Sequence, residues 1–143
     1  MDPTKPSPAS TDGFCDCSGF ACWALNTSRR TKDPSYVPRD PKQGAYGWIS
    51  TSSVWDDAQR TTGMFARCEP KVGAVIVYPD KGGKQGHIGI VTKVVGGRAA
   101  AVIHCSTSNQ RITKTDAILE TAPTVFDARS DTLCAWYSGL TEV

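Results

Sequence analysis

The chain has two histidines, His87 and His104, and each lies in a run of residues that is predicted to form a β-strand. Gly96-Gly97 between the runs predicts a two-residue hairpin turn, which places His104 opposite Gly89. The two imidazoles then project from one face of the sheet as diagonal neighbours, about 7–8 Å apart at the backbone. A shift of one residue in register would send them to opposite faces. Such a pair favours a functional site over two unrelated, half-buried histidines.

A candidate nucleophile lies where the first predicted helix begins. Residues 18–26 favour a buried helix with Asp16 as its N-cap, so Cys17 lies at its start. The partial positive charge of a helix N-terminus favours a thiolate, and the free N–H groups of the first turn can bind an oxyanion. Cys15 lies before the helix and Cys22 within it, so neither has both advantages. By default the cysteines are free thiols, because disulfides are rare in reducing compartments.

The remaining pattern predicts an α+β fold with a small antiparallel sheet, because helices come first and consecutive strands follow. A second helix is expected with Ser53 as its cap and with Asp56 and Asp57 in its first turns. The segment between the helices, residues 27–46, holds several prolines and charges and is predicted to be a surface loop. The expected strands cover residues 74–78, 87–94, 99–105 and 132–137.

Length and composition narrow the class of protein. The 143 residues suit one domain, predicted for residues 12–143, with residues 1–11 as a flexible lead-in. A net charge of +2 is too small to indicate nucleic-acid binding, and Arg29, Arg30 and Lys32 are interpreted as a solvated loop. The longest apolar run has six residues, far below the roughly 18 that a membrane span needs.

Three short motifs resemble the NlpC/P60 family of papain-like cysteine peptidases. They are Asp-Cys-Ser-Gly-Phe at 16–20, Gly-His-Ile-Gly-Ile-Val at 86–91 and Ile-His at 103–104. The resemblance implies a papain-like fold, with the nucleophile helix packed on the sheet, and hydrolysis of amide bonds in bacterial peptidoglycan peptides without a cofactor. It implies that Cys17 is the nucleophile, that His87 is the general base and acid, and that His104 orients His87.

The same resemblance implies which residues bind the substrate. Asp16 and Ser18 match the residues that contact the free amino end of the substrate in wall-peptide hydrolases. Trp48, in a glycine-flanked segment, is the candidate for an aromatic lip of the cleft. Asn109 and Asp116 are alternative residues for orienting His87.

Two other interpretations remain open from the sequence. Cys15, Cys17 and Cys22 could bind zinc together with Cys105 or a histidine, although C-x-C-x4-C is not the usual knuckle spacing. A papain-like domain without activity could also serve only for binding.

The start of the sequence has no basic patch leading into an apolar stretch, so no signal peptide is predicted. The expectation is synthesis in the cytoplasm, followed by action on the cell wall as a phage product or as an effector exported without a signal peptide. The sequence does not identify an inhibitor or immunity protein.

Overall fold

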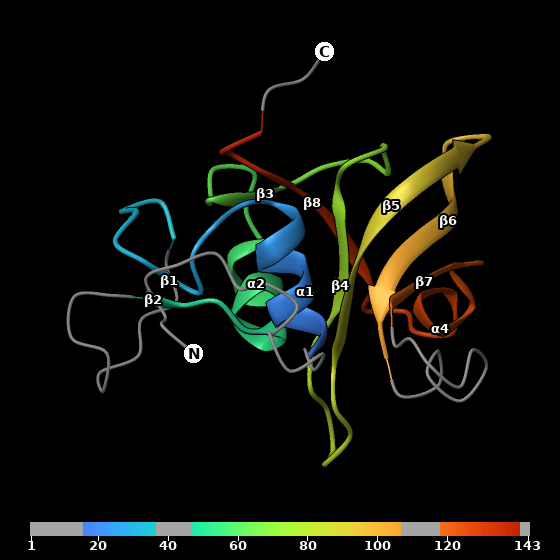
Figure 1. The fold of residues 1–143 in the computed structure, drawn as a ribbon, viewed down its shortest axis with the longest axis horizontal. Coiled ribbons are helices and arrows are strands. Elements are labelled where there is room, and N and C mark those ends of the chain that lie inside the picture. Colours follow the sequence, from blue (N-terminus) through green and yellow to red (C-terminus); the bar gives the residue numbers. More distant parts are fainter. Residues whose placement is uncertain (1–15, 37–46, 107–117, 141–143) are drawn as a thin grey trace.

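A six-stranded antiparallel sheet forms the centre of the molecule, with helices on both of its sides (Figure 1). The computed structural model describes residues 16–36, 47–106 and 118–140. The strand order is β3-β8-β4-β5-β6-β7, with bounds β3 Phe65–Arg67, β4 Val75–Tyr78, β5 His87–Val95, β6 Arg98–Cys105, β7 Ile118–Thr121 and β8 Leu133–Tyr137. A separate pair consists of β1 Arg30–Thr31 and β2 Gly47–Trp48, and the helices are α1 Cys17–Ala24, α2 Thr51–Asp57 and α4 Thr124–Asp127. The predicted α+β class with an antiparallel sheet is confirmed.

Helix α1 has a well-defined cap at each end. The Asp16 side chain accepts a hydrogen bond from the Gly19 N–H at 2.6 Å, which confirms Asp16 as the N-cap. At the other end Asn26 adopts a positive φ of 53°, and the Thr27 N–H donates to the Cys22 carbonyl in the pattern of a Schellman motif. The helix therefore starts at Cys17, one residue earlier than expected, and stops before Asn26.

Two hydrophobic clusters lie on the two sides of the sheet. The first joins α1 and α2 to the sheet through residues such as Ala21, Val54 and Ile88. The second includes Ile76, Val91, Val102, Phe126 and Cys134, and it packs α4 against the sheet. Alternation along a strand sends neighbouring side chains to opposite sides, so both sides of the central strands are apolar.

The β5–β6 hairpin has the predicted register. Ile90 pairs with Ile103 and Val91 with Val102, as the two-residue turn requires. Gly96 and Gly97 both have positive φ, 60° and 76°, which is the backbone of a type I′ turn. The pairing shifts by one residue at Lys93 and returns to the original register at Val94. The register at the end of the hairpin that holds the histidines is therefore unaffected.

The start of the second helix was predicted wrongly. Ser50, not Ser53, is the N-cap, and Ser53 is the third helical residue, whose hydroxyl completes a capping box. Asp57 is not in the first turn but ends the helix, fully buried, where it accepts the Phe65 N–H at 2.8 Å and pairs with Arg60. Ser50, Ser52 and Ser53 could each be the N-cap of this helix, and tertiary packing decides which of them is.

The described part of the expected surface loop is more structured than predicted. Residues 30–31 pair with Gly47–Trp48, and Tyr36 is fully buried, with its hydroxyl donating to the Trp48 carbonyl. The four expected strands are present with ends shifted by about one residue, whereas β3, β7 and α4 were not predicted. These elements have three or four residues each, which is too short for a periodic signal.

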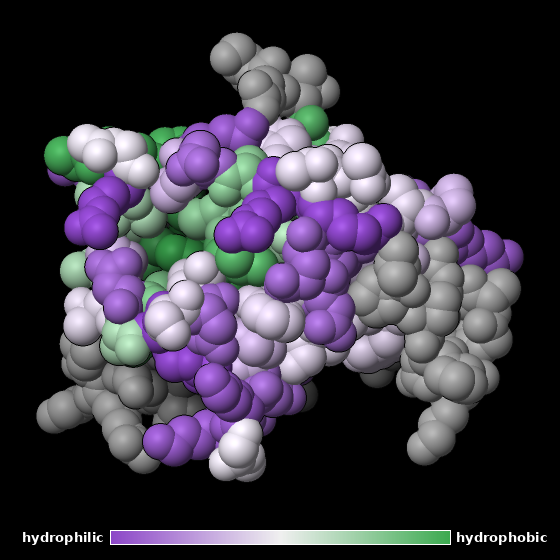
Figure 2. All heavy atoms as spheres, turned by 180° about the vertical axis from the view of Figure 1, so that it is seen from behind, coloured by the Kyte–Doolittle hydropathy of each residue, from purple (hydrophilic) through white to green (hydrophobic). Residues whose placement is uncertain are grey.

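The surface seen from behind is largely hydrophilic, with an apolar area hollowed between hydrophilic residues (Figure 2). Among the described residues, no helix is both long enough and apolar enough to cross a membrane. The predicted lead-in at residues 1–11 lies outside the described residues.

Candidate active site

The two imidazoles lie on one face of the sheet and contact each other directly. His87 Nε2 and His104 Nδ1 are 2.7 Å apart, a hydrogen bond between β5 and β6. Gly89 lies opposite His104, and a side chain at Gly89 would come within 3.1 Å of the His104 Cβ. The absence of a side chain at Gly89 therefore allows the two rings to meet, and the predicted one-face arrangement is confirmed.

The hydrogen bonds also determine which nitrogen carries each proton. The Thr121 hydroxyl donates to the Ala122 carbonyl at 2.8 Å, so its oxygen accepts the bond from His104 Nε2, also at 2.8 Å. Neutral His104 then has its proton on Nε2, and its Nδ1 accepts the Nε2–H of His87. In the part of the chain that is described, no group bonds to Nδ1 of His87, so its lone pair can act as a base.

A buried aromatic ring holds the pair in an apolar environment. Phe126 of α4 is fully buried, and its ring lies 5.3 Å from that of His87, nearly parallel at 22°, and 5.8 Å from that of His104. Burial, and then the charge of His104, lower the pKa of His87 to about 4. Burial also lowers the pKa of His104. Both rings are therefore neutral at pH 7, as a base and its orienting acceptor need to be.

This shift predicts that the fold loses stability in mild acid. His87 titrates near 6.5 when unfolded and near 4 when folded, so the unfolded chain binds more protons between these pH values. Stability should fall as the pH drops from about 6.5 to 4, by up to about 3 kcal/mol from this group. Urea unfolding at pH 7, 5.5 and 4 measures the loss. The variant His87→Asn should show a clearly smaller loss, and an equal loss in both proteins would contradict the prediction.

Cys17 is the first residue of α1 and is partly buried. Its Sγ lies 3.5 Å from the Thr51 hydroxyl, at the start of α2. Asp16 occupies the N–H groups of Gly19 and Phe20, through its carboxylate and its carbonyl respectively. Among the described residues, the N–H groups of Cys17 and Ser18 have no partner, so they are free to stabilise an oxyanion beside Sγ.

Cys17 and His87 approach the same end of the sheet from different sides. Ile88, next to His87, packs in the same cluster as Cys17, so alternation directs His87 toward Phe126. His87 is nevertheless the first residue of β5 and pairs with Tyr78, the last residue of β4. The pKa of Tyr78, which pairs with His87, is raised chiefly by burial, and a charge on Cys17 would raise it further.

Asp16 and Ser18, the two residues that flank Cys17, belong to a polar cluster with Arg29. One guanidinium nitrogen of Arg29 lies 3.3 and 3.2 Å from the two carboxylate oxygens of Asp16, and the other donates to the Ser18 hydroxyl at 2.9 Å. Ser18 is 5% exposed, whereas the Asp16 side chain is 59% exposed. Asp16 is therefore open to a substrate, while the Ser18 hydroxyl is occupied within the cluster.

Trp48 also contacts this cluster, because the Arg29 guanidinium lies 5.0 Å from the centre of its ring. The structure thus brings Trp48 close to Asp16 through Arg29. The interpretation of Arg29 as a solvated residue was wrong, since its side chain is only 12% exposed. A charged residue in a proline-rich segment was expected to face solvent. The Arg29 side chain is instead covered by its ion pair with Asp16 and by the ring of Trp48.

The cysteines do not assemble a metal site in the part of the chain that is described. No disulfide joins any two of Cys17, Cys22, Cys68, Cys105 and Cys134, and no three His, Cys, Asp or Glu side chains among the described residues could hold a metal ion together. Burial raises the pKa of Cys22 to about 12, which disfavours its thiolate. Cys15, Asn109 and Asp116 lie outside the described residues.

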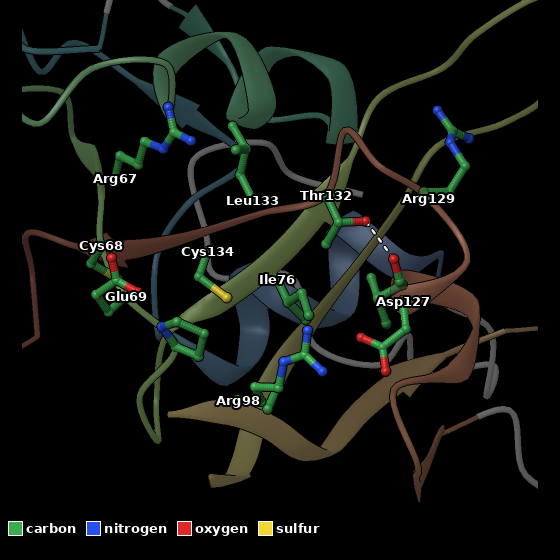
Figure 3. Close-up of a pocket in the computed structure, with 13 residues that line it drawn as sticks. Arg67, Cys68, Glu69, Ile76, Arg98, Asp127, Arg129, Thr132, Leu133 and Cys134 are labelled. Carbon is green, nitrogen blue, oxygen red and sulfur yellow. Dashed lines mark hydrogen bonds between the residues drawn. The ribbon is translucent and has the colours of Figure 1, made fainter. Parts of the chain in front are cut away.

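A separate hollow of about 570 Å³ lies beyond Phe126. Figure 3 shows it, with Ile76 and Cys134 in the sheet and Thr132 donating to the Phe126 carbonyl at 2.7 Å. Cys17, His87 and His104 do not line it. The histidine pair is therefore separated from this hollow by the Phe126 ring that stacks on it.

Three residues of the site were missed from the sequence: Thr121, Arg29 and Phe126. Thr121 and Phe126 belong to elements that were not predicted, and Arg29 was assigned to solvent. The Schellman motif at the end of α1 could have indicated the position of Arg29, because it turns the chain back shortly before this residue.

Comparison with protein families matches the CHAP domain to residues 9–109, most of the chain and all three motifs. Comparison with curated proteins and with solved structures gave no match. CHAP domains fall in the NlpC/P60-like class of papain-like cysteine peptidases and amidases, so the resemblance read from the motifs and the papain-like fold are confirmed. The family indicates a hydrolase of the amidase or peptidase type that acts on peptidoglycan. A chain with this match, this α+β sheet and this site belongs to the CHAP domain family.

Proposed function

We propose that the chain is a cysteine amidase or endopeptidase that hydrolyses amide bonds in peptidoglycan stem peptides through Cys17, His87 and His104. The observation that carries this proposal is the 2.7 Å bond between the imidazoles, whose outer partner Thr121 leaves His87 Nδ1 as a free base. Cys17, at the start of α1 near the same strand end, supplies the nucleophile and two free N–H groups.

The first half-reaction forms a thioester. Sγ of Cys17 leaves its contact with Thr51 and gives its proton to Nδ1 of His87, and the thiolate attacks the scissile carbonyl carbon. The N–H groups of Cys17 and Ser18 stabilise the oxyanion. As the C–N bond breaks, His87 returns the proton to the leaving amine.

The second half-reaction hydrolyses the thioester. His87 Nδ1 takes a proton from water, whose oxygen attacks the acyl carbon. The C–S bond breaks, the thiolate regains the proton, and the product leaves as a carboxylic acid. His104 holds His87 in the required tautomer throughout, because its Nδ1 accepts the Nε2–H of His87.

Digestion of purified peptidoglycan, with mass spectrometry of the fragments, tests this function. Each cut should release one new amine and one new carboxyl group and so identify the bond. A substrate analogue that deacylates slowly should leave an acyl group on Cys17, detectable by its mass. Absence of any new fragment from intact walls and from isolated stem peptides would contradict the function.

The role of His104 predicts a graded series of variants. His104→Asn and His104→Gln keep an amide oxygen that can accept the Nε2–H of His87, so they should retain measurable activity. His104→Ala supplies no acceptor and should be lower, by about 10-fold or more. Cleavage rates on one stem peptide across pH measure the series. Wild-type activity in His104→Ala would show that His104 has only a packing role and would transfer the orienting role to Asn109, Asp116 or water.

We also propose that the protein acts on the bacterial cell wall, as a phage product or an exported effector. Support comes from the peptidoglycan substrate that the family indicates.

A further inference from the structure

Cys68 and Cys134 lie directly opposite each other on neighbouring stretches of the sheet. The register of β3 and β8 ends with Arg67 opposite Ala135, and one further step pairs Cys68 with Cys134. The Cys68 N–H donates to the Cys134 carbonyl at 3.0 Å, so the ladder continues through this pair. Opposite residues of an antiparallel pair send their side chains to the same face of the sheet. The two thiols therefore leave the sheet side by side, although no disulfide joins them.

Both thiols lie on the side of the sheet that α4 covers. Cys134 belongs to the second hydrophobic cluster, and Cys68 packs against that cluster. Both residues line the hollow beyond Phe126 (Figure 3). Cys134 is 9% exposed whereas Cys68 is half-buried, so a reagent that enters the hollow reaches Cys68 more easily. Burial raises the pKa of Cys134 to about 12, which makes Cys68 the thiol that reacts first.

The backbone separation of this pair suits a disulfide. Cα atoms of a directly opposite, hydrogen-bonded pair lie about 5.5 Å apart, within the range of about 4.4–6.8 Å that disulfides span. Cβ atoms of opposite residues are about 4.5–5.5 Å apart, and a disulfide needs about 3.5–4.5 Å, so they must approach by about 1 Å. Cys68 can make this movement, because it follows a three-residue strand at the edge of the sheet.

We propose that Cys68 and Cys134 form a dithiol site that a low-molecular-weight disulfide oxidises to an intramolecular disulfide. The Cys68 thiolate attacks one sulfur of the reagent, which forms a mixed disulfide and expels one thiolate. Cys134 then loses its proton, and its sulfur attacks the Cys68 sulfur and expels the second thiolate. The two protein thiols lose two electrons and two protons, and the reagent takes them up as it becomes two thiols.

The bond closes residues 68–134 into a ring that contains β4, β5, β6, β7 and α4, and with them both imidazoles. Such a cross-link restricts the unfolded chain, so the oxidised form should be harder to unfold. Reducing compartments keep a pair of this kind as thiols, and oxidising surroundings allow the bond. The site thus makes the stability of the fold depend on redox conditions.

Incubation of the folded protein with reduced or with oxidised glutathione, followed by alkylation and digestion, tests the proposal. Trypsin cuts after lysine and arginine, so it leaves Cys68 in residues 68–71 and Cys134 in residues 130–143. Protein treated with oxidised glutathione should yield these two peptides joined, and dithiothreitol should separate them. Cys68→Ser should yield none of the joined product. If the joined product does not form, because Cys68 keeps its glutathione or joins another cysteine, the proposal is overturned.

Thermal unfolding gives a second readout. The Tm of oxidised wild type should exceed that of reduced wild type by about 10 °C, as expected for one cross-link in a domain of this size. Cys68→Ser should have the same Tm under both conditions, and it is the matched control because it keeps any reaction of glutathione at Cys17. An equal shift in both proteins, or no shift in wild type that carries the bond, overturns the effect on stability. Neither measurement uses hydrolysis, so either failure leaves the proposed function in place.

Discussion

Replacement of Cys17 by alanine is expected to abolish amide hydrolysis, with a loss of about 10⁴-fold or more in kcat. The substitution removes the atom that forms the thioester, and no other described thiol lies at a helix N-terminus. Release of fragments from peptidoglycan, quantified by mass spectrometry, measures the loss. Retained cleavage by Cys17→Ala would contradict the assignment of the nucleophile.

The fold of this variant should be intact, because Cys17 is partly exposed and its Sγ has one polar contact among the described residues, with the Thr51 hydroxyl. The change in unfolding free energy should stay within about 1 kcal/mol. Cys22→Ala is the matched control, since Cys22 lies in the same helix but is 1% exposed and packed in the core. It should lose more stability than Cys17→Ala and keep most of its activity.

Replacement of His87 by alanine should be nearly as damaging as loss of Cys17, because both half-reactions need its Nδ1 and the nucleophile and base act as a unit. The double variant Cys17→Ala, His87→Ala should therefore be no slower than either single variant. Reaction with iodoacetamide gives a second measurement, in which wild type should alkylate at Cys17 faster than His87→Ala does at pH 6–7.

His104→Asn serves as the control for His87→Ala, because it alters the partner of the base and keeps the base itself. Its activity should lie well above that of His87→Ala. If the two variants were equally inactive, or if His87→Ala kept substantial activity, the division of roles between the imidazoles would be wrong.

The hairpin and the nucleophile helix could be predicted because their signals are local. Two adjacent glycines select one turn geometry, and that turn determines the register of both strands, so His87 and His104 had to share a face. An aspartate directly before an apolar run predicts a helix N-cap without any other information. Asp16 therefore places Cys17 at the start of the helix.

Other features of the site depend on contacts between residues far apart in the chain. Thr121, in a four-residue strand, determines the proton positions on the imidazoles. Phe126, in a four-residue helix, makes the surroundings of the imidazoles apolar. Neither element is long enough to show periodicity in the sequence.

The sequence by itself determined the α+β class, the hairpin register and the position of Cys17, because capping and turn geometry act over a few residues. The tertiary structure alone decided which imidazole nitrogen is free, how deeply the histidines are buried and that Arg29 neutralises Asp16. The physical reason is that pKa values, tautomers and ion pairs depend on which groups lie within a few ångströms, and packing brings those groups together from distant positions in the chain.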